Sequence, residues 1–280
     1  MALPALIMFI GFGVIPLLGV LALSFSSWDG IGAIHPAGLQ SWRSVLNPGL
    51  LHALKVTFLI TALSWLFQTP MSILLGTFLA GRQRYRGFLA VLYFIPLLLS
   101  SAALAITYKA LLDPNFGLGA GLGIPLLSQD WLGRGNLAIG VVVFVVSWQF
   151  IPFHSLIYQA GVRQIPVSLY EAAQIDGAGR IRQFFSVTLP QLKYTILTSS
   201  TLIVVGSLTF FDIIFVLTAG GPADATRTLA LDMYITGFQG NLMGQASAIA
   251  MILVLLGLVL ALLLQRLGGR DRSASQLEGM

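Results

Sequence analysis

The chain has 280 residues, of which 56% are hydrophobic and only 9% are charged. About a quarter of the residues in a soluble domain are charged, because its surface faces water, so this composition excludes an ordinary soluble fold and indicates a protein that lies in lipid. The absence of cysteine excludes disulfides and cysteine-ligated metals. The net charge of +5 does not indicate a nucleic-acid partner, because in a membrane protein the placement of the charges carries the information.

Six stretches of at least 18 residues contain no Lys, Arg, Asp, Glu or His. A helix needs about 20 mostly apolar residues to cross the hydrocarbon core of a bilayer, so each stretch can hold one spanning helix. We therefore predict an all-α membrane protein with one transmembrane domain over residues 1–280. The predicted spans are about 4–25, 52–80, 88–112, 136–160, 196–217 and 242–265.

Basic residues are divided unequally between the two sides of the predicted bundle. Ten of them follow the second, fourth and sixth spans, and at most five lie on the other side. Positive charge is retained on the cytoplasmic side, so both termini and the loop 161–195 are predicted to be cytoplasmic. The ten residues are Arg82, Arg84, Arg86, Arg163, Arg180, Arg182, Lys193, Arg266, Arg270 and Arg272.

The first apolar stretch is interpreted as a retained span and not as a signal peptide. No Lys or Arg precedes it, and it is longer than the apolar region of a usual signal peptide. Little sequence comes before it, so an earlier start site is left open.

The predicted cytoplasmic loop 161–195 has an internal order of its own. Ser168 stands three residues before Glu171, which is the spacing of a capping box, and Gly177 can adopt the left-handed conformation that ends a helix. We therefore predict a short helix over about 169–176. Its residues combine apolar, small and acidic side chains, namely Leu169, Ala172, Ala173, Ile175, Glu171 and Asp176. Such a helix suits the groove of a partner protein, but it also suits the lipid headgroup region.

The same loop carries a recognisable pattern. The segment 171–178 reads EAAQIDGA, and 187–190 reads VTLP. The loop resembles the EAA loop of permease subunits in binding-protein-dependent ABC importers, within the carbohydrate branch that includes the maltose and glycerol-3-phosphate permeases. Val187 and Tyr194 depart mildly from the usual pattern. The first span and the segment LTAGGPADATRTL at 217–229 are also similar to that family, so the resemblance covers nearly the whole chain.

The resemblance implies a type I ABC importer permease in the bacterial inner membrane. It implies a second permease subunit, two cytoplasmic ATP-binding subunits, an extracytoplasmic solute-binding protein, and a sugar or related polar solute. The loop would form the coupling helix that docks on the ATPase, with ATP and Mg on that partner and no cofactor in this chain. The coupling residues implied are Ser168, Leu169, Glu171, Ala172, Ala173, Asp176 and Gly177.

The sequence offers no site for covalent chemistry. A nucleotide-binding P-loop requires a lysine that follows glycine, and neither Lys55, Lys109 nor Lys193 does so. The three histidines have no metal-ligand spacing, and the acidic residues form no pair suited to acid–base catalysis. We expect neither an enzyme nor a metal site.

Polar and aromatic residues within or beside the spans are candidates for a solute path. Polar groups in hydrocarbon usually face a cavity or another helix, so Asp212 is either a hydrogen-bond acceptor for a solute or a structural partner of a neighbouring helix. The same two readings apply to the other candidates. They are Gln149, Phe150, His154, Phe211, Asn241 and Gln245, with Asn241 and Gln245 expected on one helical face.

Two other function classes compete with the importer. An ion- or proton-coupled secondary transporter would require membrane-embedded ion sites and usually repeated halves, and no convincing repeat is present. A membrane scaffold that transports nothing is the third possibility, and it would not stimulate ATP hydrolysis by its partners.

Overall fold

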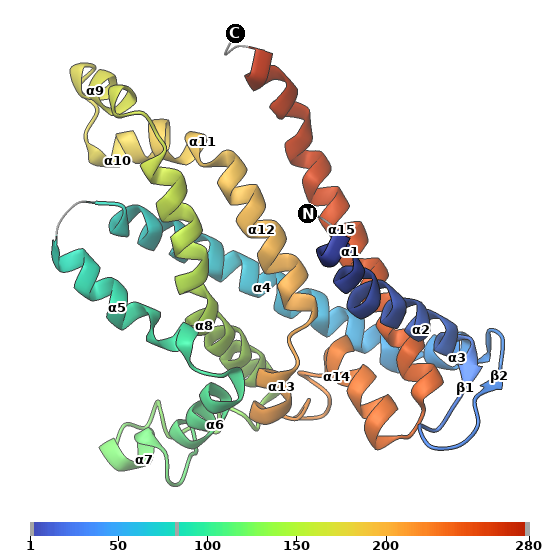
Figure 1. The fold of residues 1–280 in the computed structure, drawn as a ribbon. Coiled ribbons are helices and arrows are strands. Elements are labelled where there is room, and N and C mark those ends of the chain that lie inside the picture. Colours follow the sequence, from blue (N-terminus) through green and yellow to red (C-terminus); the bar gives the residue numbers. More distant parts are fainter. Residues whose placement is uncertain (1–2, 82–83, 278–280) are drawn as a thin grey trace.

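The computed structural model describes residues 3–81 and 84–277 and is predominantly helical (Figure 1). Four helices are long and apolar enough to cross a membrane. The first is a continuous run made of α1 (Leu3–Phe9), the π-helical η1 (Ile10–Val14) and α2 (Ile15–Ser24). The others are α4 (Pro48–Leu79), α8 (Gly135–Arg163) and α15 (Met243–Leu277). These four correspond to the predicted spans 4–25, 52–80, 136–160 and 242–265.

The predicted span 88–112 is bent. It consists of α5 (Arg84–Leu98) and α6 (Ser101–Leu111), which meet at an angle of 95°. The Ser100 hydroxyl accepts a hydrogen bond from the Ala103 amide at 3.2 Å and so caps the start of α6. A serine inside an apolar run therefore starts a second helix here, and one straight span was the wrong prediction.

The predicted span 196–217 is also interrupted. Helix α12 (Lys193–Leu208) ends before Thr209, and α13 (Asp212–Leu217) begins three residues later. The Thr209 hydroxyl donates to the carbonyl of Gly206 at 2.9 Å, and Asp212 supplies a negative charge in the first turn of α13. By length and composition the described residues contain four spanning helices, or five if the bent pair is one span, so the count of six stays a prediction.

Short elements connect the long helices at the two ends of the bundle. The end drawn at the bottom and lower right of Figure 1 carries the strands and the short helices of the loops predicted to be outside. These are β1 (Ser26–Ser27) and β2 (His35–Pro36), which pair antiparallel, with α3 (Gln40–Val45), α7 (Leu118–Leu122), α14 (Leu229–Tyr234) and the π-helical η3 (Ile235–Gln239). The opposite end carries α9 (Val167–Ile175), α10 (Arg180–Gln183), the π-helical η2 (Phe184–Thr188) and α11 (Leu189–Gln191).

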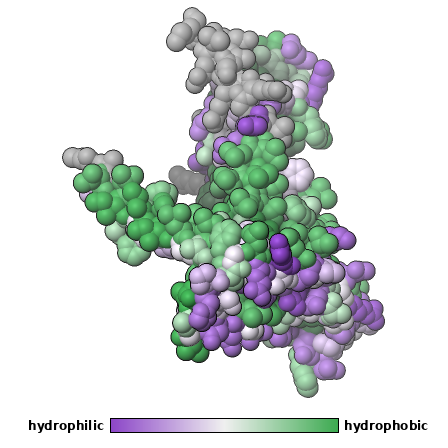
Figure 2. All heavy atoms as spheres, turned by 90° about the vertical axis from the view of Figure 1, so that its right-hand side faces the viewer, coloured by the Kyte–Doolittle hydropathy of each residue, from purple (hydrophilic) through white to green (hydrophobic). Residues whose placement is uncertain are grey.

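The loop 161–195 and the C-terminal end of α15, both predicted to be cytoplasmic, lie at one end of the molecule, and which side of the membrane this end faces stays a prediction. Helix α9 and the C-terminal end of α15 lie at the same end of the molecule in Figure 1. Figure 2 shows hydrophobic residues over the middle of the molecule and along a projecting arm, with hydrophilic residues gathered at the lower end. Of the predicted cytoplasmic arginines, Arg82 lies outside the described residues.

The most extensive contact between two helices of the bundle lies between α4 and α8. A Cβ atom added to Gly76 of α4 would lie 2.6 Å from the Cβ of Tyr158 and 2.7 Å from the carbonyl oxygen of Ser155, both on α8. In lipid, where hydrocarbon offers no solvent driving force between helices, such close approach of small residues is a main source of helix association. Ser72, one turn before Gly76, donates to the carbonyl of Ile151 on α8 at 3.3 Å, and other buried serines and threonines of α4 are Thr57, Thr61, Ser64 and Thr69.

We expect Gly76→Ala to destabilise the bundle, because backbone atoms of α8 occupy the position of the new methyl group. Overpacking of this kind typically lowers the free energy of unfolding by about 1–3 kcal/mol. Gly140→Ala is the matched control, since Gly140 also lies inside a spanning helix but has nothing within 4 Å of the added Cβ. Thermal unfolding of the detergent-purified transporter measures both, and equal melting temperatures would contradict the packing argument.

Candidate functional site

The helix α9 is the ordered centre of the predicted coupling loop. It begins at Val167, one turn after α8 ends, and its N-cap is Pro166, with no side-chain hydrogen bond to the helix. The capping box predicted at Ser168 and Glu171 is therefore wrong. Proline, in an extended conformation with ψ of 133°, already directs the chain into the helix, so Ser168 lies inside the first turn and cannot cap it.

The C-terminal end of α9 agrees with the prediction. Gly177 has φ of +74°, and its amide donates to the carbonyl of Gln174 at 3.0 Å. The amide of Ala178 donates to the carbonyl of Ala173 at 2.8 Å. These two bonds form a Schellman motif, which ends the helix and turns the chain toward α10.

Helix α9 presents its side chains to the surroundings and not to its own bundle. No residue of α9 is buried, and the apolar side chain of Ile175 is 86% exposed. One contact orients the helix, because the hydroxyl groups of Tyr170 and Thr188 are hydrogen-bonded at 2.9 Å. Of the predicted coupling residues, Ala173 is half-buried; the exposed ones are Ser168, Leu169, Glu171, Ala172, Asp176 and Gly177.

A cavity of about 440 Å³ lies in the middle of the bundle. Its wall is formed by α4, α8 and α12 together with the two interruptions, between α5 and α6 and between α12 and α13. Aromatic rings and a few polar groups share this wall. The lining residues are Gln68, Leu97, Ser101, Phe150, Phe153, His154, Leu202, Ile203, Gly206, Thr209, Phe210, Phe211, Asp212 and Ile213.

Four of the seven predicted path residues meet in this cavity. Phe150 and His154 come from α8, whereas Phe211 and Asp212 come from the interruption before α13. The ring of Phe150 stacks on that of Phe210 with centroids 5.6 Å apart. Nδ1 of His154 lies 3.0 Å from the Ser199 hydroxyl, so one ring nitrogen is held by α12.

Gln149 is buried and holds the bend between α5 and α6. Its amide nitrogen donates to the carbonyl of Leu99 at 3.2 Å, and its amide oxygen accepts from the Ser101 hydroxyl at 3.2 Å. The bend frees backbone groups that lipid cannot satisfy, and Gln149 satisfies one of them. The structure thus gives this predicted path residue a structural contact.

Asn241 and Gln245 lie outside the cavity. Asn241 precedes α15 and has φ of +52°, so it does not share a helical face with Gln245, and that prediction was wrong. Gln245 lines a smaller polar pocket of about 240 Å³. This pocket lies at the end of the bundle that carries α3 and α14.

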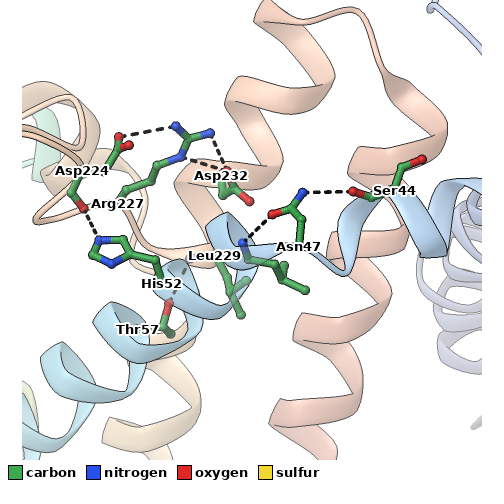
Figure 3. A network of polar contacts seen from close by, with 9 residues as sticks. Ser44, Asn47, His52, Thr57, Asp224, Arg227, Leu229 and Asp232 are labelled. Carbon is green, nitrogen blue, oxygen red and sulfur yellow. Dashed lines mark hydrogen bonds and ion pairs between the residues drawn. The ribbon is translucent and has the colours of Figure 1, made fainter.

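The polar pocket is bordered by a network of hydrogen bonds and ion pairs (Figure 3). Nη2 of Arg227 lies 2.6 Å from the Asp232 carboxylate, and Nη1 lies 3.4 Å from Asp224. Burial lowers the pKa of Arg227, but hydrogen bonding and the charge of Asp232 outweigh it, so the pKa lies above its usual value. Nε2 of His52 is 3.0 Å from the Asp224 carbonyl, which ties the loop before α14 to α4.

Three polar cavity residues were missed by the sequence reasoning, namely Gln68, Ser101 and Thr209. Gln68 could have been predicted from the sequence, because it is an amide inside a predicted span, as Gln149 is. Ser101 and Thr209 lie at the two helix interruptions, which charge-free length does not reveal. Among the described residues, no group of three or more His, Asp or Glu side chains is placed to hold a metal ion.

Comparisons with known proteins identify the family. Residues 68–272 match the family described as binding-protein-dependent transport system inner membrane component. The chain is 30% identical to the probable ABC transporter permease protein YurN of Bacillus subtilis, over 93% of this chain and 91% of that protein. It is 31% identical to the multiple sugar-binding transport system permease protein MsmF of Streptococcus mutans, over 84% and 83% of the two chains.

Solved structures confirm the fold. A chain of a bacterial alginate ABC transporter, crystallised with an alginate pentasaccharide-bound periplasmic protein, superposes with a TM-score of 0.83 at 24% identity, over 96% of this chain and 93% of that one. A chain of the methionine ABC transporter MetNI in an inward-facing conformation gives a TM-score of 0.56 at 16% identity, over 84% of this chain and 98% of that chain. The chain belongs to the family of inner membrane components of binding-protein-dependent transport systems.

Proposed function

We propose that this chain forms the membrane path of an ATP-driven importer for a neutral sugar or a related polyhydroxylated solute. The observation that carries the proposal is the cavity of about 440 Å³ at mid-bundle, where aromatic rings and hydrogen-bonding groups lie together. Sugars present apolar ring faces and hydroxyl edges. Stacked rings such as Phe150 and Phe210 suit the faces, and the Asp212 carboxylate suits the hydroxyls.

The electrostatics of the cavity favour a neutral solute over a phosphorylated one. Neither Lys nor Arg lines its described wall, whereas Asp212 does. An anionic solute would meet like charge in a site of low dielectric constant, which is unfavourable. A relative that is 35% identical is named as an sn-glycerol-3-phosphate transport system permease protein. The charge of the cavity lining in this chain supports a different, uncharged solute.

The partners follow from the exposed helix α9. No residue of α9 is buried, Ile175 and Leu169 expose apolar surface, and the small residues Ala172 and Ala173 permit close approach, which suits docking of a partner. We infer that α9 docks on one of two cytoplasmic ATP-binding subunits, which bind ATP and Mg. A second permease subunit would complete the bundle, and an extracytoplasmic solute-binding protein would deliver the solute. An ion-coupled mechanism has no support in the family assignment.

The docking role of α9 is testable by Ile175→Asp. We expect loss of the ATP-binding subunits during purification and loss of solute-stimulated ATP hydrolysis, because a buried unpaired carboxylate would oppose docking. Ile31→Asp is the control, since Ile31 is also an exposed isoleucine, 94% accessible, but lies in the loop before β2 at the opposite end. Normal retention of the subunits in Ile175→Asp would refute the docking role.

The cavity itself is testable by Asp212→Asn. A hydrogen bond to a charged group contributes about 1.5–3 kcal/mol, so we expect the half-saturating solute concentration for uptake to rise about tenfold or more. Gln245→Ala is the control, because Gln245 lies in the separate polar pocket. Uptake into proteoliposomes that contain the complete transporter measures both variants. Unchanged saturation in Asp212→Asn would leave Asp212 with only a structural role.

A further inference from the structure

Gln68 of α4 combines burial, a missing partner and a place on the cavity wall. The residue is 1% exposed, and its Nε2 atom has no hydrogen-bond partner among the described residues. It lines the mid-bundle cavity together with His154 and Asp212. A buried amide without a partner is unfavourable in any protein, and the hydrocarbon around a membrane helix offers it none.

Two other glutamines of the bundle have hydrogen-bond partners for their amide nitrogens, whereas the hydroxyls of Ser64 and Thr69, close to Gln68 on α4, are unpartnered as well. Gln149 makes two hydrogen bonds at the α5–α6 bend, and the amide nitrogen of Gln159 donates to the carbonyl of Leu79 at 2.8 Å. Ser72 lies one turn further along α4 and donates to the carbonyl of Ile151 at 3.3 Å. These residues join one helix to another. Gln68 makes no such contact through its amide nitrogen, although α8 packs along the same helix.

We propose that Gln68 contacts the transported solute and selects for a hydroxyl group at that position. The proposal rests on the proposed function, because it requires the cavity to be the solute path. A hydroxyl group both donates and accepts a hydrogen bond, so it satisfies either end of the amide. An apolar solute group would leave the amide unpaired, which is how buried polar groups produce discrimination between similar ligands.

Gln68 and Asp212 would contact different parts of a solute in the cavity. Gln68 is neutral and comes from α4, whereas Asp212 is charged and comes from the far side of the α12–α13 interruption. A polyhydroxylated solute between them donates a hydrogen bond to the carboxylate and shares one with the amide. Phosphate and carboxylate groups can only accept from the amide, and they are repelled by Asp212.

The first test is uptake of a panel of labelled neutral solutes, comprising glycerol, xylose, glucose, maltose and raffinose, into proteoliposomes with the complete transporter. For the solutes taken up, we expect Gln68→Leu to raise the half-saturating concentration about tenfold. Thr69→Val is the matched control, because Thr69 is the next residue, is also buried with an unpartnered hydroxyl, and does not line the cavity. Its half-saturating concentration should equal that of the unmodified transporter.

The second test needs no solute. It uses cysteine labelling, which is specific to the introduced residue because the chain itself contains no cysteine. Gln68→Cys, Thr209→Cys and Thr69→Cys are each treated with a small hydrophilic methanethiosulfonate reagent in the assembled transporter, and labelling of this chain is read by mass. We expect modification at positions 68 and 209, which line the cavity, and none at position 69.

The outcomes separate this inference from the function on which it rests. Labelling at position 209 but not at 68, or unchanged saturation in Gln68→Leu, overturns the role of Gln68 and leaves the path intact. Absence of labelling at both positions 68 and 209, or no uptake of any solute in the panel, overturns the proposed path and the role of Gln68 with it.

Discussion

The structure depends on the close contact between α4 and α8. Gly76 leaves no room for a Cβ atom against Tyr158 and Ser155, and Ser72, one turn before it, donates to the carbonyl of Ile151 on α8. In lipid, such close packing holds helices together in place of the hydrophobic effect that drives their association in soluble proteins. The broken helices α5–α6 and α12–α13 enclose the cavity against these two helices. The first helix, by contrast, has no buried residues in its spanning window and is left for lipid or a partner subunit.

Much of the fold follows from solvation alone. Four predicted spans coincide with continuous helices, because an apolar run in hydrocarbon must satisfy its backbone groups internally. The interruptions at Ser100 and at Thr209–Phe211 could not be predicted in this way, since serine and threonine also occur inside regular membrane helices, as Thr57 and Ser72 do in α4. At the α5–α6 bend, Gln149 holds the turn through tertiary contacts with Leu99 and Ser101, which the sequence of the run itself does not show.

The candidate site was predicted only in part, because polar and aromatic residues can be recognised in an apolar run but their tertiary neighbours cannot. Phe150, His154, Phe211 and Asp212 were found because they are conspicuous inside or beside apolar runs, and the structure brings them together. Asn241 and Gln245 were grouped by an assumed helical register that the left-handed Asn241 does not obey. The helix α9 was located correctly, but its N-terminal capping was not, because Pro166 occupies the N-cap position and Ser168 lies inside the first turn.

The helices around the cavity share one further property. Each has an interruption in its backbone hydrogen-bond ladder within two residues of the wall: Pro70 is two residues from Gln68, Pro96 precedes Leu97, Pro152 precedes Phe153, and a gap begins at Thr209. A helix that lacks a ladder bond bends there at lower energy than elsewhere. Bending of these helices is therefore favoured at the height of the cavity. The helical segments on the two sides of these interruptions can tilt relative to one another without a change in their own hydrogen bonding.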